Sequence, residues 1–181
     1  MENQNNSKTT RENPNRKLGL GMIMLAWVAI IALLGYFFFN QEINQQNPNR
    51  KAETQHFEGE TRLTLKENRY HHYVASGMIN NSKVTLLIDT GATSVAIPAK
   101  LQKKLNLPNG RPIMAYTANG SVEVETTVIN ELNIGDIKLY NIEATLNPSM
   151  DYTDEILLGM SALKQLDVSF NEGQLTLVQS R

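Results

Sequence analysis

Cysteine is absent from this sequence of 181 residues, and the charges nearly cancel, with a formal net charge of -1 at pH 7. The lack of cysteine excludes a disulfide framework but leaves the cellular compartment open. The sequence has no excess of basic residues to create the electrostatic field that attracts nucleic acid, so we expect no nucleic-acid partner. The length leaves room for one modest domain with appendages.

Charge is also missing from Leu18–Phe39, a stretch of 22 residues. As a helix that rises about 1.5 Å per residue it would span about 33 Å, against about 30 Å of membrane hydrocarbon. The stretch is longer than the ~7–15 apolar residues of a signal peptide, and no small-residue cleavage site follows it. It therefore predicts an uncleaved transmembrane signal anchor over residues 18–39.

The segments on either side of this stretch are polar. Residues 1–17 contain four basic residues and no apolar periodicity, which predicts a disordered tail on the cytoplasmic side of the membrane. Residues 40–64 are rich in Asn and Gln and predict a flexible tether. The folded domain is then expected over residues 65–181.

The most informative stretch is Val84–Ala92, in which an apolar strand runs directly into Asp89, Thr90 and Gly91. The apolar and β-branched residues predict a strand that is buried on both faces. A carboxylate at the end of such a strand costs free energy unless it is paired or used, and glycine gives the backbone extra freedom there. The combination predicts a carboxylate held rigidly at the floor of a cleft, with Asp89 as the candidate catalytic residue.

The flanking sequence gives this motif a structural context. Tyr73–Ile79 and Lys83–Ile88 surround the polar residues 80–82, which predicts a hairpin with a tight turn. After the motif, Thr93–Ile97 predicts a short strand. Pro98 and the apolar spacing of Ala99–Leu105 then predict a short helix with proline at its first position.

This order of hairpin, Asp-Thr-Gly-Ala, short strand and helix resembles that of the retropepsin-like aspartic proteases, and more closely their bacterial membrane-anchored members. A second apolar strand that ends in glycine, within Ile156–Met160, and a predicted helix over residues 161–166 repeat the pattern. The resemblance covers about residues 65–178 and implies an all-β acid-protease barrel with two short helices, preceded by the transmembrane helix. The second loop, packed beneath the acid-bearing loop, would contain Leu157, Leu158 and Gly159.

A further hairpin is predicted around an Asn-Gly pair, between the strands Pro112–Thr117 and Ser121–Thr126. In the proteases that this chain resembles, a hairpin at this place is the flap that closes over the substrate. An ordinary surface hairpin is the alternative. The flap would consist of Tyr116, Thr117, Ala118, Asn119 and Gly120. Two more hairpins are expected, over residues 127–142 and 168–178.

The resemblance implies peptide hydrolysis by two carboxylates that share a proton. The sequence holds one Asp-Thr-Gly, so the expected enzyme is a homodimer in which each protomer supplies Asp89. Thr90 would hold the two loops together across the axis, and Gly91 would let water or substrate approach the backbone. Ala92 has no hydroxyl group to offer the ionised carboxylates, so we expect activity at a milder pH than in the pepsins.

The resemblance also implies a cellular setting. The protein would cross the bacterial inner membrane once through residues 18–39, with its N-terminus in the cytoplasm and its protease domain in the periplasm or otherwise outside the cytoplasm. It would act on protein or peptide substrates without a cofactor or a metal. Retroviral members carry arginine at the position of Met160, and its absence here leaves the mode of dimerisation open.

Three other interpretations of the sequence exist. A metal site built from His56, His71 and His72 is disfavoured, because adjacent strand residues point to opposite faces of a sheet. A phosphate-binding loop as in actin-like kinases needs two large domains, which about 120 residues cannot supply. A retropepsin-like module that serves in binding or dimerisation, without turnover, remains an alternative.

Overall fold

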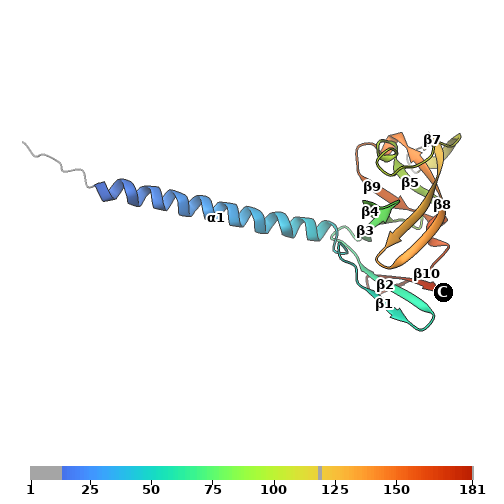
Figure 1. Ribbon diagram of the computed structural model, residues 1–181, viewed down its shortest axis with the longest axis horizontal. Coiled ribbons are helices and arrows are strands. Elements are labelled where there is room, and N and C mark those ends of the chain that lie inside the picture. Colours follow the sequence, from blue (N-terminus) through green and yellow to red (C-terminus); the bar gives the residue numbers. More distant parts are fainter. Residues whose placement is uncertain (1–13, 118–119, 181) are drawn as a thin grey trace, which may run out of the picture. The chain divides into compact units, whose positions relative to one another are not determined.

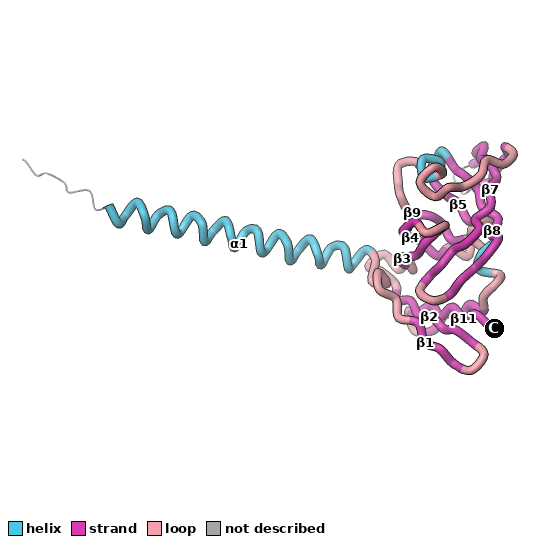
Figure 2. The backbone as a smooth tube through the Cα atoms, viewed as in Figure 1, coloured by secondary structure: helices cyan, strands magenta, loops and turns pink. Residues whose placement is uncertain are grey.

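The computed structural model describes residues 14–117 and 120–180. Contacts divide the chain into two compact units, Met1–Glu42 and Ile43–Arg181. The first unit is helical in its described part, and the second is built almost entirely of β-strands, which Figure 2 draws in magenta. The predicted all-β fold class, preceded by an apolar helix, is therefore confirmed.

Helix α1 (Pro14–Gln46) is the long helix in Figure 1. It begins with proline, whose fixed φ suits the first helical position. Its apolar side chains from Met22 to Phe39 are exposed, and it is long and apolar enough to cross a membrane. The predicted span, 18–39, lies inside it. Of the tail predicted to be disordered, residues 1–13 lie outside the described residues, whereas residues 14–17 already belong to α1.

The second unit contains two sheets, and Figure 1 labels most of their strands. The smaller sheet has the order β1-β2-β11-β10, formed by Thr54–Phe57, Glu60–Lys66, Gln174–Ser180 and Asp167–Asn171. The larger has the order β3-β4-β9-β5-β8-β7-β6, formed by Val74–Ile79, Ser82–Ile88, Glu155–Leu158, Val95–Pro98, Ile137–Asn147, Gly120–Ile134 and Pro112–Thr117. The short helices are η1 (Ala99–Leu101), η2 (Pro148–Met150) and α2 (Met160–Leu163).

The larger sheet closes on itself through strand β7. The far end of β7 pairs with β3, where Leu132 lies opposite Ile79, and this pairing joins the first strand of the sheet to a later one. The near end of β7 pairs with β6 alone, so β6 stays outside the closed ring. Fully buried aliphatic side chains fill the interior, Leu86, Ile97 and Ile142 among them.

Strand β4, which carries the chain to Asp89, alternates between buried and half-buried side chains. Val84, Leu86 and Ile88 are buried, whereas Thr85 and Leu87 are half-buried. The prediction of a strand buried on both faces is therefore wrong in detail, because only one face of β4 points into the core. The predicted tight turn before β4 is confirmed, and its residues 80 and 81 have the positive φ angles that such turns require.

The predicted flexible tether over residues 40–64 does not match the structure. Helix α1 continues to Gln46, strands β1 and β2 occupy most of the remainder, and Leu63 is completely buried. The segment lacked a clear apolar period because β1 is an edge strand with mostly exposed polar side chains. The folded unit therefore begins about twenty residues earlier than expected.

A buried amide holds the start of this unit in place. The Asn49 side chain is 5% exposed, and its Nδ2 donates to the carbonyl oxygens of Lys66, at 2.8 Å, and Val74, at 2.7 Å. Its Oδ1 accepts from the Lys66 N–H at 2.8 Å. The backbone of Asn49 also forms a parallel bridge with Ala75. The amide thus joins the segment after α1 to both β2 and β3.

The two predicted short helices are shorter than expected. In place of a helix over 99–105, the structure has the three-residue η1 followed by turns, and α2 covers only Met160–Leu163 of the region expected to be helical. Such short segments cannot offset the cost of helix nucleation by themselves, so their extent depends on packing. Leu101, Leu105 and Leu163 are buried.

We expect Asn49→Ala to lower the free energy of unfolding of the second unit by about 2–4 kcal/mol, because the polar backbone groups of Lys66 and Val74 would lose their partner. The measurement is urea unfolding of the full chain in detergent micelles, with hydrogen exchange at the Lys66 N–H. The matched control is Asn130→Ala, at an exposed position of β7, which should change the free energy by less than about 0.5 kcal/mol. Equal stabilities of the two variants would contradict this role of Asn49.

Candidate active site

Asp89 directly follows strand β4 and is half-buried. Its backbone N–H donates to the carbonyl oxygen of Leu158 at 3.1 Å, which continues the pairing of β4 with β9 by one residue. Its side-chain Oδ1 accepts a hydrogen bond from the Gly91 N–H at 2.9 Å, and its carbonyl oxygen accepts from the Ala92 N–H at 3.3 Å. The carboxylate is therefore oriented by its own loop, while Thr90 and Gly91 are exposed.

The second predicted loop lies directly against this one. Strands β4 and β9 are parallel, with Ile88 opposite Leu158, so both strands enter their loops at the same edge of the sheet. The Met160 N–H donates to the carbonyl oxygen of Ala92 at 2.8 Å, and the Ser161 N–H donates to that of Thr93 at 3.0 Å. The structure thus brings the two predicted loops together through backbone hydrogen bonds.

The two loops approach so closely that position 159 requires glycine. A Cβ atom at this position would lie 2.7 Å from the carbonyl oxygen of Ala92 and closer still to that of Ser94. Its φ of -88° is open to any residue, so steric exclusion and not backbone freedom selects glycine here. Leu157 is half-buried and Leu158 is completely buried beside it.

The register also identifies the counterpart of Asp89 within the same chain. Because Ile88 pairs with Leu158, the residues that follow them, Asp89 and Gly159, occupy equivalent positions on the two loops. Gly159 has no side chain to supply an acid. The two loops therefore present one carboxylate, that of Asp89, at this edge of the sheet.

The predicted flap is a two-stranded extension of the larger sheet. Strands β6 and β7 pair so that Tyr116 lies opposite Ser121 and Thr117 opposite Gly120. The Tyr116 side chain is 88% exposed, and Gly120 has a φ of 112°, which favours glycine. Ala118 and Asn119 lie outside the described residues. The structure confirms the hairpin. Of the strands in the described part of the chain, β6 pairs with β7 alone.

The three histidines lie in separate surroundings. His56 contacts Asp136, with 3.0 Å between Nε2 and Oδ2, and His71 contacts Glu67, with 3.2 Å between Nδ1 and Oε2. His71 and His72 belong to the loop between β2 and β3, so their predicted place on a strand is wrong. The described residues contain no group of three or more His, Cys, Asp or Glu side chains arranged to hold a metal ion.

The sequence motifs do not identify one residue that supports the site. Ser161 is buried, its Oγ accepts from the Val95 N–H at 3.0 Å, and it donates to the carbonyl oxygen of Glu143 at 2.7 Å. This hydroxyl fastens the second loop to β5 and β8. The only signal in the sequence was a serine in a short helix after a glycine, which does not identify its distant partners.

Comparison with known proteins places this geometry in a family. A family model described as gag-polyprotein putative aspartyl protease matches residues 75–165, which is half of the chain. The chain is 25% identical over 161 residues to an uncharacterized protein of Sinorhizobium sp, and the match covers 83% of this chain and 69% of the relative. It is 25% identical over 160 residues to an uncharacterized protein of Rickettsia prowazekii (strain Madrid E), covering 83% of this chain and 66%, just under two thirds, of the relative.

Among solved structures, the chain is similar to a retropepsin-like aspartic protease from Rickettsia conorii. The TM-score is 0.56 at 26% sequence identity, and the match covers 71% of this chain and 96% of the other. The parallel strands β4 and β9, with their two joined loops, lie within the region that the family model matches. The chain therefore belongs to the gag-polyprotein putative aspartyl protease family and has the fold of a retropepsin-like aspartic protease.

Proposed function

We propose that this protein is a membrane-anchored aspartic endopeptidase, in which a homodimer holds a water molecule between its two Asp89 carboxylates. The observation that carries the proposal is that Asp89 and Gly159 occupy equivalent positions on two loops that are joined by backbone hydrogen bonds. In the described part of the chain, the two joined loops have one carboxylate, that of Asp89, and no second acid. A second copy of the chain would complete it.

The two carboxylates would share one proton, because two like charges at close range do not both ionise readily. The ionised carboxylate takes a proton from the water molecule while the oxygen of that water attacks the scissile carbonyl carbon. At the same time, the protonated carboxyl group donates its proton to the carbonyl oxygen. The resulting tetrahedral diol then collapses. One proton passes to the leaving nitrogen, the C–N bond breaks, and the products are a carboxylic acid and an amine.

The surrounding residues suit this chemistry. Thr90 and Gly91 are exposed beside the carboxylate, where a second copy could meet them. Tyr116, at the end of the flap hairpin, is the most exposed large side chain of that strand pair, and we assign the hairpin to covering the peptide. Met160 is 41% exposed next to the site, which suits an apolar contact between the two copies in place of an ion pair.

We further assign α1 to a single membrane crossing with the N-terminus in the cytoplasm. Four basic residues precede the apolar run, whereas Asn40, Gln41 and Glu42, none of them basic, follow it, and this asymmetry supports the orientation. The protease unit would then lie outside the cytoplasm. Its substrates would be proteins or peptides on that side of the membrane.

We expect Asp89→Asn to reduce the rate of peptide cleavage by roughly 10²–10⁴-fold or more, since the general base is lost. Asparagine keeps an Oδ1 that can accept the Gly91 N–H, so the loop should keep its conformation. The measurement is cleavage of a peptide library by the full chain, analysed by mass spectrometry. The control is Asp167→Asn, an exposed position of β10, which should cleave like the parent. If the parent and the Asp89 variant are equally inactive, the domain is a binding module without turnover.

Mixing experiments test the two-copy site. When the Asp89→Asn chain is added in nine-fold excess to a fixed amount of parent chain in mixed micelles, parent activity should fall to about one tenth, because most active chains then pair with an inactive partner. The same excess of an Asp89→Asn chain that also carries Gly159→Arg, which cannot form a proper loop pair, should leave the activity higher. Activity that does not change on addition of the Asp89→Asn chain would show that one carboxylate suffices.

A further inference from the structure

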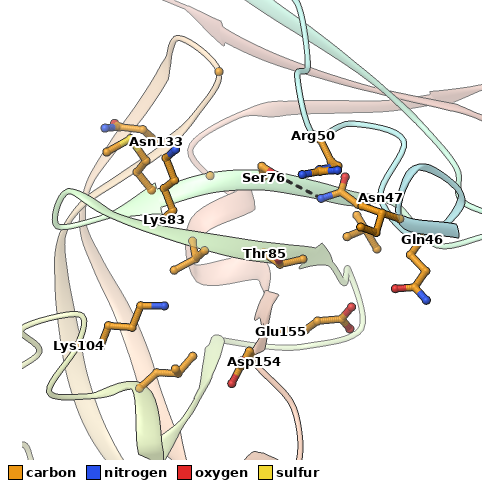
Figure 3. A pocket seen from close by; sticks show the side chains of 17 residues that line it. Gln46, Asn47, Arg50, Ser76, Lys83, Thr85, Lys104, Asn133, Asp154 and Glu155 are labelled. Atoms are coloured by element: carbon orange, nitrogen blue, oxygen red, sulfur yellow. Dashed lines mark hydrogen bonds between the residues drawn. The ribbon is translucent and has the colours of Figure 1, made fainter. Parts of the chain in front are cut away.

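A pocket of about 730 Å³ lies in the second unit, and Asp89 is not among its lining residues. Its walls come from the segment that follows the apolar run, from β3 and β4, from the turns after η1 and from the start of β9. Figure 3 shows polar side chains from several of these segments around the hollow, including Asn47 and Ser76, which are joined by a 3.2 Å hydrogen bond. The catalytic proposal leaves this pocket without a role.

Three cations line the pocket from three separate segments. Arg50 follows α1, Lys83 belongs to β4, and Lys104 lies in the turns after η1. All three are exposed, and no carboxylate in the described part of the chain forms an ion pair with any of them. Figure 3 shows Arg50 and Lys83 on opposite sides of the hollow, with Lys104 on another. The pocket is therefore suited to an anion.

Two acidic residues, Asp154 and Glu155, also line the pocket. The Lys100 ammonium lies 2.8 Å from Asp154, and its hydrogen bond to that carboxylate, with its charge, lowers the pKa of Asp154. Asp154 is thus paired with Lys100, which is not part of the lining, and the charge of Lys104 lowers the same pKa further. In Figure 3 both acids lie together, away from Arg50 and Lys83. An anion would therefore bind at the basic side of the pocket, away from these two acids.

The covalent structure limits how far this pocket can be from a membrane. Helix α1 is continuous through Gln46, and Ile43, which lines the pocket, is four residues beyond Phe39 at the end of the apolar run. At about 1.5 Å per residue this is about 6 Å, and the polar headgroup layer of a leaflet is about 5–8 Å thick. Ile43, which lines the pocket, therefore lies at the depth of the lipid phosphates if α1 crosses the bilayer.

We propose that this pocket binds the phosphodiester headgroup of an anionic phospholipid, an inference that rests on the membrane crossing assigned to α1. Arg50, Lys83 and Lys104 surround the phosphate, and the Ser76 hydroxyl can donate to one of its oxygens. Basic clusters next to a transmembrane helix attract anionic lipids in this way. The bound lipid holds the protease unit against the bilayer in one orientation.

The test compares two triple variants of the full chain in a neutral detergent. The pocket variant carries Arg50→Gln, Lys83→Gln and Lys104→Gln, and the control carries Arg111→Gln, Lys138→Gln and Lys164→Gln at exposed positions outside the pocket. Both lose the same charge and keep the basic N-terminal tail. Native mass spectrometry would measure the dissociation constants of phosphatidylglycerol and phosphatidylcholine.

We expect the parent chain and the control to bind phosphatidylglycerol at least about tenfold more tightly than phosphatidylcholine, and the pocket variant to lose that preference. The preference should weaken at high salt, because the cations are exposed. Equal binding by the pocket variant and the control would overturn the proposal. So would displacement of the lipid by inorganic phosphate or by an acidic peptide at a lower concentration than that of the lipid.

This readout does not depend on peptide cleavage. The Asp89→Asn chain should bind phosphatidylglycerol like the parent, so a failure of the catalytic proposal leaves the lipid measurement intact. Conversely, a pocket variant that loses lipid binding but cleaves peptides normally in detergent separates the two sites.

Discussion

The hydrogen bond from the Asp89 N–H to the carbonyl oxygen of Leu158 is the contact on which the arrangement of the site depends. It extends the parallel pairing of β4 and β9 into their loops, and Gly159 then lets the loops approach without a steric clash. A side chain at this glycine would separate the loops and displace Ala92. The position of the carboxylate is therefore set by backbone contacts within a closed sheet, and not by its own side-chain partners alone.

The local parts of this architecture could be predicted from the sequence because their signals are local. The Asn-rich turn before β4, the Asn-Gly hairpin and the repeated apolar strand with its glycine each depend on a few adjacent residues. The same holds for Asp89, whose motif is contiguous. Resemblance to a protease family followed from the order of these motifs, and the family and the fold are both confirmed.

The remaining features depend on contacts between distant residues. Ser161 bonds to groups 66 and 18 residues away, and the Asn49 amide bonds to Val74, 25 residues away. Asparagine in a polar segment indicates a loop by composition, so the docking of residues 43–53 could not be seen. The basic pocket was missed for the same reason, because Arg50, Lys83 and Lys104 come together only through the fold.

The smaller sheet has a consequence for the order in which the molecule forms. Strand β11, near the end of the chain, lies between β10 and β2, and Leu177 pairs with Leu63 from near the beginning of the domain. This sheet cannot be completed until β11 has been synthesised, and β11 is made after α1 and β2. Long-range pairing of this kind is slow. The second unit therefore completes its fold well after α1 has been synthesised.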